Sequence, residues 1–134
     1  MNTISHVSLI VHNQDDALAF YTEKLGFVVT ESHKAEDGTW YWLTVAPTKD
    51  SSVSLTLMAP QAEEDKALIG KQAGSIPFFC LMTDDCHATA AEFSKKGVEF
   101  VQEPQTEFWG INAILKDLYG NLILLCEQPA EENQ

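Results

Sequence analysis

The chain has 134 residues, the length of one domain, and its apolar fraction of 45% is ordinary for a protein with a hydrophobic core. Its formal net charge is −12, from 20 acidic against 8 basic residues. This charge argues against a nucleic acid or an anionic membrane surface as partner, because phosphate binding needs a basic patch. We expect most of the acidic residues to lie on a solvated surface. The charge is also compatible with a cationic ligand.

The cysteine content and the apolar runs indicate the compartment. Cys80, Cys86 and Cys126 are too few and too irregularly spaced for a disulfide framework. No apolar run has the length of a membrane span, and no secretory segment opens the chain. We therefore expect a cytoplasmic protein with reduced cysteines.

The first half of the chain predicts one strand, one helix and three more strands. Residues 4–11 alternate between apolar and polar side chains, as a half-buried strand does. Residues 13–26 are typical of a helix, with Asn13 as its N-cap and Gly26 at its end. The three following strands are predicted, between turn-forming segments, at residues 27–32, 39–46 and 52–59.

After a loop at residues 60–74, the second half repeats this order. A strand is predicted at residues 76–83, followed by a helix at 84–97 that Asp84 or Asp85 caps and Gly97 ends. The remaining strands are predicted at residues 98–103, 110–117 and 121–127.

The two halves are therefore predicted to be copies of one βαβββ module. Ala17 and Ala88 lie 71 residues apart, as do Gly26 and Gly97, and the offset before the helices is 72. The predicted fold class is α+β, in a single domain of two tandem modules. We place module one at residues 1–59, the linker at 60–74, module two at 75–129 and a polar tail at 130–134. A generic α+β domain without the repeat is the alternative.

Four segments resemble a known family. "HVSLIVHNQDDALAFYTEKLGF" is similar to the opening module of the glyoxalase/bleomycin resistance/extradiol dioxygenase group, the vicinal oxygen chelate superfamily. "DDCHATAAEFSKKGVEFVQEP", "FWG" and "KDLYGNLILLCE" resemble its second module. The resemblance implies paired modules whose mixed sheet curls around a cavity, and often a homodimer. In metal-containing members it implies four ligands, one on the first and one on the last strand of each module.

The residues at these four places are poor ligands. His6 matches the first histidine, but its counterpart at the offset of 72 is Phe78. Leu124 stands where the resemblance implies a glutamate, and the last strand of module one offers only the hydroxyls of Ser54 and Thr56. Zinc-type sites take three or four protein ligands, and neutral hydroxyls are poor ones. We therefore expect no metal or other cofactor, with a divalent ion at His6 as the alternative.

Alternation within the strands predicts which side chains line the cavity instead. The predicted lining residues are His6, Ser8, Trp40, Trp42, Ser54, Thr56, Phe78, Cys80, Met82, Leu122 and Leu124. Phe108 and Trp109 of "FWG" are expected to cap the cavity or the dimer seam, before a Gly110 with an unusual backbone angle. No carboxylate is clearly placed in the cavity. The alternative is that these side chains simply fill the sheet face and that His6 has no role.

The leading functional prediction is a metal-free binder of a small hydrophobic or cationic molecule. The first alternative is a metal-dependent lyase, isomerase or dioxygenase of the glyoxalase type, in which His6 is the only candidate catalytic residue. The second is a non-catalytic structural module with a filled cavity. A homodimer is expected from the resemblance and from the frequency of two-fold oligomers.

Overall fold

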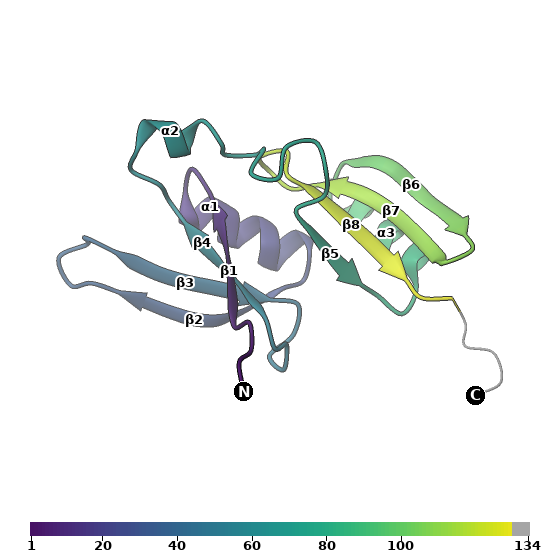
Figure 1. Cartoon of the computed structure of the whole chain (residues 1–134), viewed down its shortest axis with the longest axis horizontal. Helices are drawn as coiled ribbons and strands as arrows, with labels where there is room; N and C mark the ends of the chain where they lie inside the picture. Colours follow the sequence, from purple (N-terminus) through teal and green to yellow (C-terminus); the bar gives the residue numbers. More distant parts are fainter. Residues whose placement is uncertain (130–134) are drawn as a thin grey trace. The chain divides into compact units, whose positions relative to one another are not determined.

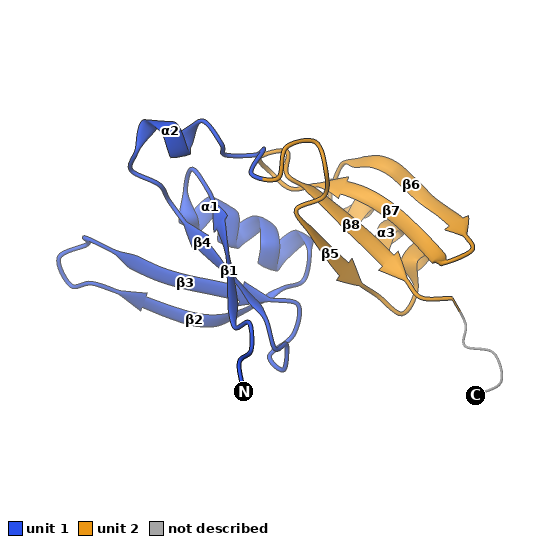
Figure 2. Ribbon diagram, viewed as in Figure 1, with its two compact units in different colours: residues 1–72 blue, residues 73–134 orange. Residues whose placement is uncertain are grey.

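The chain forms two compact units, Met1–Gln72 and Ala73–Gln134, in a computed structural model that describes residues 1–129. Figure 2 shows the two units in blue and orange. Each unit has one four-stranded mixed sheet and a helix against one face of it, which confirms the predicted α+β class and the repeated βαβββ order (Figure 1). The polar tail predicted at 130–134 lies outside the described residues. In the described part of the chain, no helix combines the length and the apolar character needed to cross a membrane.

Unit one contains the four strands and the helix of the predicted module, with bounds that differ slightly from the predicted ones, and an additional π-helical turn, η1. They are β1 (His6–Ile10), α1 (Gln14–Ala19), η1 (Phe20–Lys24), β2 (Val28–Lys34), β3 (Tyr41–Ala46) and β4 (Ser54–Met58). The strand order is β1-β4-β3-β2, with β1 parallel to β4 and the other pairs antiparallel. The predicted linker contributes a short helix, α2 (Glu63–Lys66), and most of it belongs to this unit.

Side-chain amides complete the hydrogen bonding of unit one. Asn13 caps α1 as predicted, because its side chain accepts a 2.8 Å hydrogen bond from the backbone N–H of Asp16. The amide of Gln72 lies along the edge of β1, where it accepts from Ile10 N–H at 3.0 Å and donates to the Ser8 carbonyl at 2.8 Å. Gln72 thus satisfies backbone groups that an edge strand otherwise leaves open.

Unit two repeats the arrangement. Its elements are β5 (Phe79–Met82), α3 (Cys86–Lys95), β6 (Phe100–Glu107), β7 (Gly110–Lys116) and β8 (Leu122–Glu127). The strand order is β5-β8-β7-β6, with β5 parallel to β8. Of the two predicted caps of α3, Asp85 is the one used: its carboxylate accepts from Ala88 N–H at 3.0 Å. The Glu127 carboxylate also accepts from Cys86 N–H at 2.7 Å.

The core of each unit lies between its sheet and its helix. Leu9, Leu43, Val45 and Leu57 are fully buried in unit one and alternate along their strands with the predicted lining residues. The fully buried strand residues of unit two are Ala113, Leu115, Ile123 and Leu125. On the same strand faces, five other residues are partly or largely exposed: Val7, Tyr41, Val53, Phe79 and Leu81. Phe79 and Leu81 are less buried because they lie on β5, an edge strand, whereas α3 packs mainly on β6, β7 and β8.

The same backbone irregularity interrupts the outer hairpin of both sheets. Val29 pairs with Val45, but two residues later Glu31 pairs with Thr44, so one residue of β2 is extra. In unit two, Phe100 pairs with Leu115 and Gln102 pairs with Ile114. The extra residues, Thr30 and Val101, are 71 positions apart, so the β-bulge is part of the repeat.

Candidate functional site

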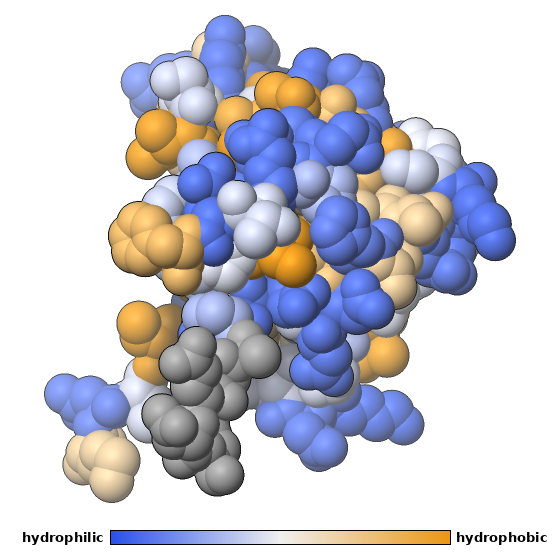
Figure 3. Space-filling view, turned by 90° about the vertical axis from the view of Figure 1, so that its right-hand side faces the viewer, coloured by the Kyte–Doolittle hydropathy of each residue, from blue (hydrophilic) through white to orange (hydrophobic). Residues whose placement is uncertain are grey.

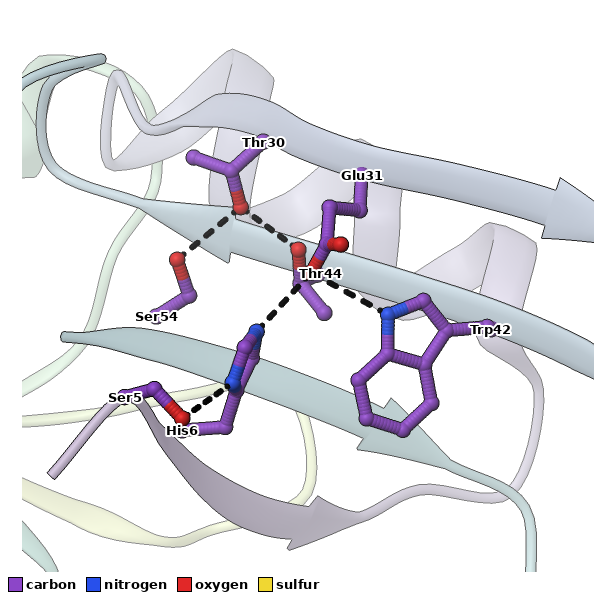
Figure 4. A network of polar contacts seen from close by, with 7 residues as sticks. All are labelled: Ser5, His6, Thr30, Glu31, Trp42, Thr44 and Ser54. Atoms are coloured by element: carbon purple, nitrogen blue, oxygen red, sulfur yellow. Dashed lines mark hydrogen bonds and ion pairs between the residues drawn. The ribbon is translucent and has the colours of Figure 1, made fainter.

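A cluster of polar contacts lies on one face of the sheet of unit one, centred on Glu31 (Figure 4). Its Oε1 lies 2.9 Å from His6 Nε2 and accepts a 3.1 Å hydrogen bond from the Trp42 indole N–H. The His6 and Trp42 rings meet edge to face, with centroids 5.4 Å apart. The other imidazole nitrogen, Nδ1, lies 2.9 Å from Ser5 Oγ.

The contact between His6 and Glu31 shows that this sheet is strongly curled. His6 is on β1 and Glu31 is on β2, which are the two opposite edges of the sheet. The edges of a flat four-stranded sheet lie about 14 Å apart, at ~4.8 Å per strand spacing. The 2.9 Å contact therefore requires the edges to bend toward each other, so that His6, Glu31 and Trp42 line a concave face.

A group of hydroxyls lies beside this cluster. Thr30 Oγ1 lies 2.5 Å from Thr44 Oγ1 and 2.9 Å from Ser54 Oγ. The bulge explains the arrangement, because it lets the consecutive residues Thr30 and Glu31 both reach side chains of the same face. Thr56 is 2% exposed, yet its Oγ1 has no hydrogen-bond partner among residues 1–129. An unpaired buried hydroxyl is uncommon and costs about 1–3 kcal/mol, so this atom is a candidate contact for a bound molecule.

Glu31 supplies negative charge to the concave face. The hydrogen bond from Trp42, and next the one from His6, lower the pKa of this carboxyl below its ordinary value. Both contacts use Oε1, and no other described residue bonds Oε2. The site thus presents an ionised oxygen with free acceptor capacity next to an indole ring.

Four of the residues predicted in unit one come together here: His6, Trp42, Ser54 and Thr56. Ser8 is exposed on β1 and pairs with Thr56 across the parallel ladder. Trp40 was predicted inside the strand but lies before β3, where its side chain is 56% exposed. Ser54 and Thr56 are thus buried, whereas Ser8 and Trp40 are exposed.

The predicted residues of unit two lie on its own sheet and hairpin. Cys80 pairs with Leu124, and Phe78 N–H donates to the Leu122 carbonyl at 2.8 Å. Met82 follows two positions after Cys80, so it shares the sheet face that is turned away from α3. The β6–β7 turn exposes Phe108 and Trp109, whose rings meet edge to face at 4.8 Å.

Glu31 was not among the residues predicted from the sequence, in which no carboxylate was clearly placed in the cavity. The extra residue of the bulge shifts the inward and outward alternation of β2, so a strict period of two gives no indication of it. Two adjacent polar residues, Thr30 and Glu31, after Val28 and Val29 are the available signal.

Comparison with known proteins decides the family. Residues 3–125 match the model of the Glyoxalase/Bleomycin resistance protein/Dioxygenase superfamily. The chain belongs to this superfamily.

Several relatives resemble the chain over most of its length. An uncharacterized protein of Shewanella frigidimarina is 36% identical over 121 residues, covering 90% of this chain and 89% of the relative. The crystal structure of UcmS2 is 36% identical with a TM-score of 0.82, covering 94% and 98% of the two chains. TnmS3, an antibiotic binding protein from a Streptomyces species, is 29% identical with a TM-score of 0.78, covering 96% and 98%.

The side chains at the ligand positions of metal-containing superfamily members do not suit a metal ion here. The parallel registers, in which Leu9 pairs with Leu57 and Leu81 with Leu125, are consistent with the predicted correspondence of His6 with Phe78. With the same correspondence Thr56 matches Leu124, so unit one offers an imidazole and a hydroxyl at these positions, and unit two offers a phenyl ring and an alkyl group. Both nitrogens of that imidazole already have partners. Within residues 1–129, no group of three or more His, Cys, Asp or Glu side chains is placed to hold a metal.

Proposed function

We propose that this superfamily member binds a small hydrophobic or cationic molecule, without a metal, on the concave face of unit one. The observation that carries the proposal is the Glu31 carboxylate, which is fixed by His6 and Trp42 and keeps Oε2 for a further donor. The description of TnmS3 as an antibiotic binding protein supports the same class of function.

The chemistry of the face suggests what the ligand carries. The Trp42 indole offers a flat apolar surface for a ring or a cation. Glu31 Oε2 suits an ammonium or another N–H group, and Thr56 Oγ1 suits a second polar atom. We therefore expect a planar organic molecule with a basic or N–H group at one end.

The charge of the protein favours such a ligand. The net charge of −12 attracts cationic solutes at a rate that falls as salt rises. On the face of the molecule shown in Figure 3, hydrophilic residues predominate and hydrophobic residues form small separate groups.

A thermal-shift panel of planar cationic and neutral aromatic compounds tests the proposal on protein treated with a chelator. A ligand at a hundredfold excess over its Kd stabilises the folded state by ~2.7 kcal/mol, so binding raises Tm. Glu31→Gln and Trp42→Ala should reduce the shift, while Glu64→Gln, an exposed acid of α2, should leave it unchanged. Failure of every compound to move Tm would instead favour a structural module with a filled cavity.

The second candidate function is catalysis. The contact between Glu31 and His6 supports it, because a carboxylate that orients an imidazole is the arrangement of a general base. Such a base increases a reaction rate by ~10²–10⁴-fold. A glyoxalase-type lyase, isomerase or dioxygenase would also need its metal. Elemental analysis separates the candidates: stoichiometric nickel, zinc, iron or manganese held at His6 supports the enzyme and contradicts the binder.

We further propose that the protein is a homodimer. The superfamily resemblance and the frequency of two-fold oligomers support this. Light scattering should then give twice the chain mass of 14.9 kDa.

A further inference from the structure

Two thiols meet on the sheet of unit two. Cys80 is on β5 and Cys126 on β8, and the Cys80 thiol donates to Cys126 Sγ across 3.1 Å. Both are free cysteines. No part of the candidate site of unit one involves them, so a role for these thiols is independent of the proposed function.

Met82 provides a third sulfur-containing side chain on the same sheet. β5 and β8 are parallel, and Cys126 pairs with Met82 while Cys80 pairs with Leu124. Paired residues of neighbouring strands project to the same side, so the two thiols and the Met82 thioether share one face. Cys80 is exposed and Met82 is 50% exposed, so this sulfur cluster of Cys80, Met82 and Cys126 is open to small solutes.

The register disfavours a disulfide between the two thiols. Cys80 and Cys126 are diagonal neighbours, displaced by two residues along the strands. Diagonal neighbours in a sheet have Cα atoms about 7–8 Å apart. A disulfide needs about 4.4–6.8 Å between Cα atoms, so closing the bond requires the backbone to move. We therefore expect the pair to remain as two thiols.

We propose that the sulfur cluster binds one soft monovalent metal ion, Cu(I), through the two cysteine sulfurs and the Met82 thioether. Thiolate and thioether ligands select Cu(I), whereas carboxylates and waters suit Mg²⁺ and Ca²⁺. Beside the cluster, Leu124 is apolar, and the side-chain oxygen of Asn112, which pairs with Cys126, already accepts a hydrogen bond from Gln102. Zinc takes four protein ligands in a closed site, and this cluster supplies three sulfurs.

Metal uptake here is an exchange of protons for Cu(I). When two Cu–S bonds form, the two S–H protons pass to solvent and the metal stays Cu(I), so no oxidant or reductant is needed. The affinity should therefore rise with pH.

Cys86 provides a matched control within the same unit. It is fully buried at the start of α3, and its Sγ lies 3.8 Å from the Leu125 carbonyl. It therefore faces the core and takes no part in the cluster.

Anaerobic titration of the reduced full-length protein with Cu(I), against a coloured Cu(I) chelator, tests the proposal. We expect one Cu(I) per chain, with an affinity that increases about tenfold per pH unit for each proton displaced. Cys80→Ser and Cys126→Ser should each weaken binding by more than ~100-fold, beyond the effect of losing an outer contact. Met82→Leu should weaken Cu(I) binding about tenfold, and Cys86→Ala should leave the Cu(I) affinity unchanged.

Three results would overturn the proposal. They are no Cu(I) binding by the reduced protein, equal binding by the Cys80→Ser variant, or zinc binding as tight as Cu(I) binding. Cys80 is exposed, so its serine variant is expected to fold even if Cys126→Ser does not, and circular dichroism of each variant checks this.

Discussion

Glu31 and Gln102 occupy equivalent positions in the two units, each next to the extra residue of the same β-bulge. Glu31 pairs with Thr44 on β3, and Gln102 pairs with Ile114 on β7. Each also bonds the side chain two positions earlier on that strand. Trp42 donates to Glu31 at 3.1 Å, and Gln102 donates to Asn112 Oδ1 at 2.8 Å. The repeat thus places a charged acceptor in unit one and its neutral isostere in unit two.

The first prediction uses this natural isostere. Glu31→Gln should leave unit one folded, because unit two already accommodates glutamine at this place, but it should raise the Kd of a cationic ligand at least ~10-fold. Calorimetric titration measures the change. Equal affinities for the variant and the parent protein would show that Glu31 is not the charged contact.

The second prediction concerns pH. The folded-state pKa of Glu31 lies below the unfolded value of ~4.3, so its contacts add stability that is present above that value. This contribution is lost as the pH falls through the folded pKa. The difference in unfolding free energy between the parent and Glu31→Gln should therefore be constant near neutral pH and shrink below about pH 4. Urea titrations across that range measure it, and the same difference for Glu64→Gln should change less.

The third prediction compares two buried threonines. Thr56→Val removes a hydroxyl without a partner and should raise stability by up to about 1 kcal/mol. Thr44→Val removes the partner of Thr30 and should lower stability by about 1 kcal/mol. Chemical denaturation measures both. If Thr56 also contacts the ligand, Thr56→Val should weaken ligand binding while it stabilises the protein. A loss of stability in both variants would show that the Thr56 hydroxyl has a partner in the folded protein.

The fourth prediction concerns Gly110. Its φ of 136° is unfavourable for other residues, and a Cβ there would collide with the carbonyl oxygen of Glu127. Gly110→Ala should therefore lower the unfolding free energy by about 3 kcal/mol or more, from strain plus collision. Gly38→Ala is the control, because its φ is also positive, 74°, but its Cβ would meet nothing within 4 Å. Gly38→Ala should lower the unfolding free energy by only about 1–2 kcal/mol.

Local signals predicted the framework of each unit well. Asn13 and Asp85 cap the helices, and Gly26 and Gly97 follow them with φ of 74° and 89°. These features depend on a few adjacent residues, so the sequence carries them directly. The correspondence of His6 with Phe78 stays a prediction that rests on the offset of the repeat.

The chemistry of the candidate site depended on features with a weak local signal. The bulge at Thr30 is defined by pairing between strands, so Glu31 could not be assigned to a face from alternation alone. The curl that joins His6 to Glu31 is a property of the whole sheet. The π-helical turn at Phe20–Lys24 also replaced the end of one predicted helix, since both share nearly the same apolar spacing.

Metal-free ligand binding is tested by calorimetric titration of chelator-treated protein with the compound that raises Tm most. We expect one molecule to bind per chain without added metal, and the affinity to fall at least ~10-fold in both Glu31→Gln and Trp42→Ala. Binding that needs stoichiometric nickel, zinc, iron or manganese, or that is unchanged in both variants, would contradict the proposed function.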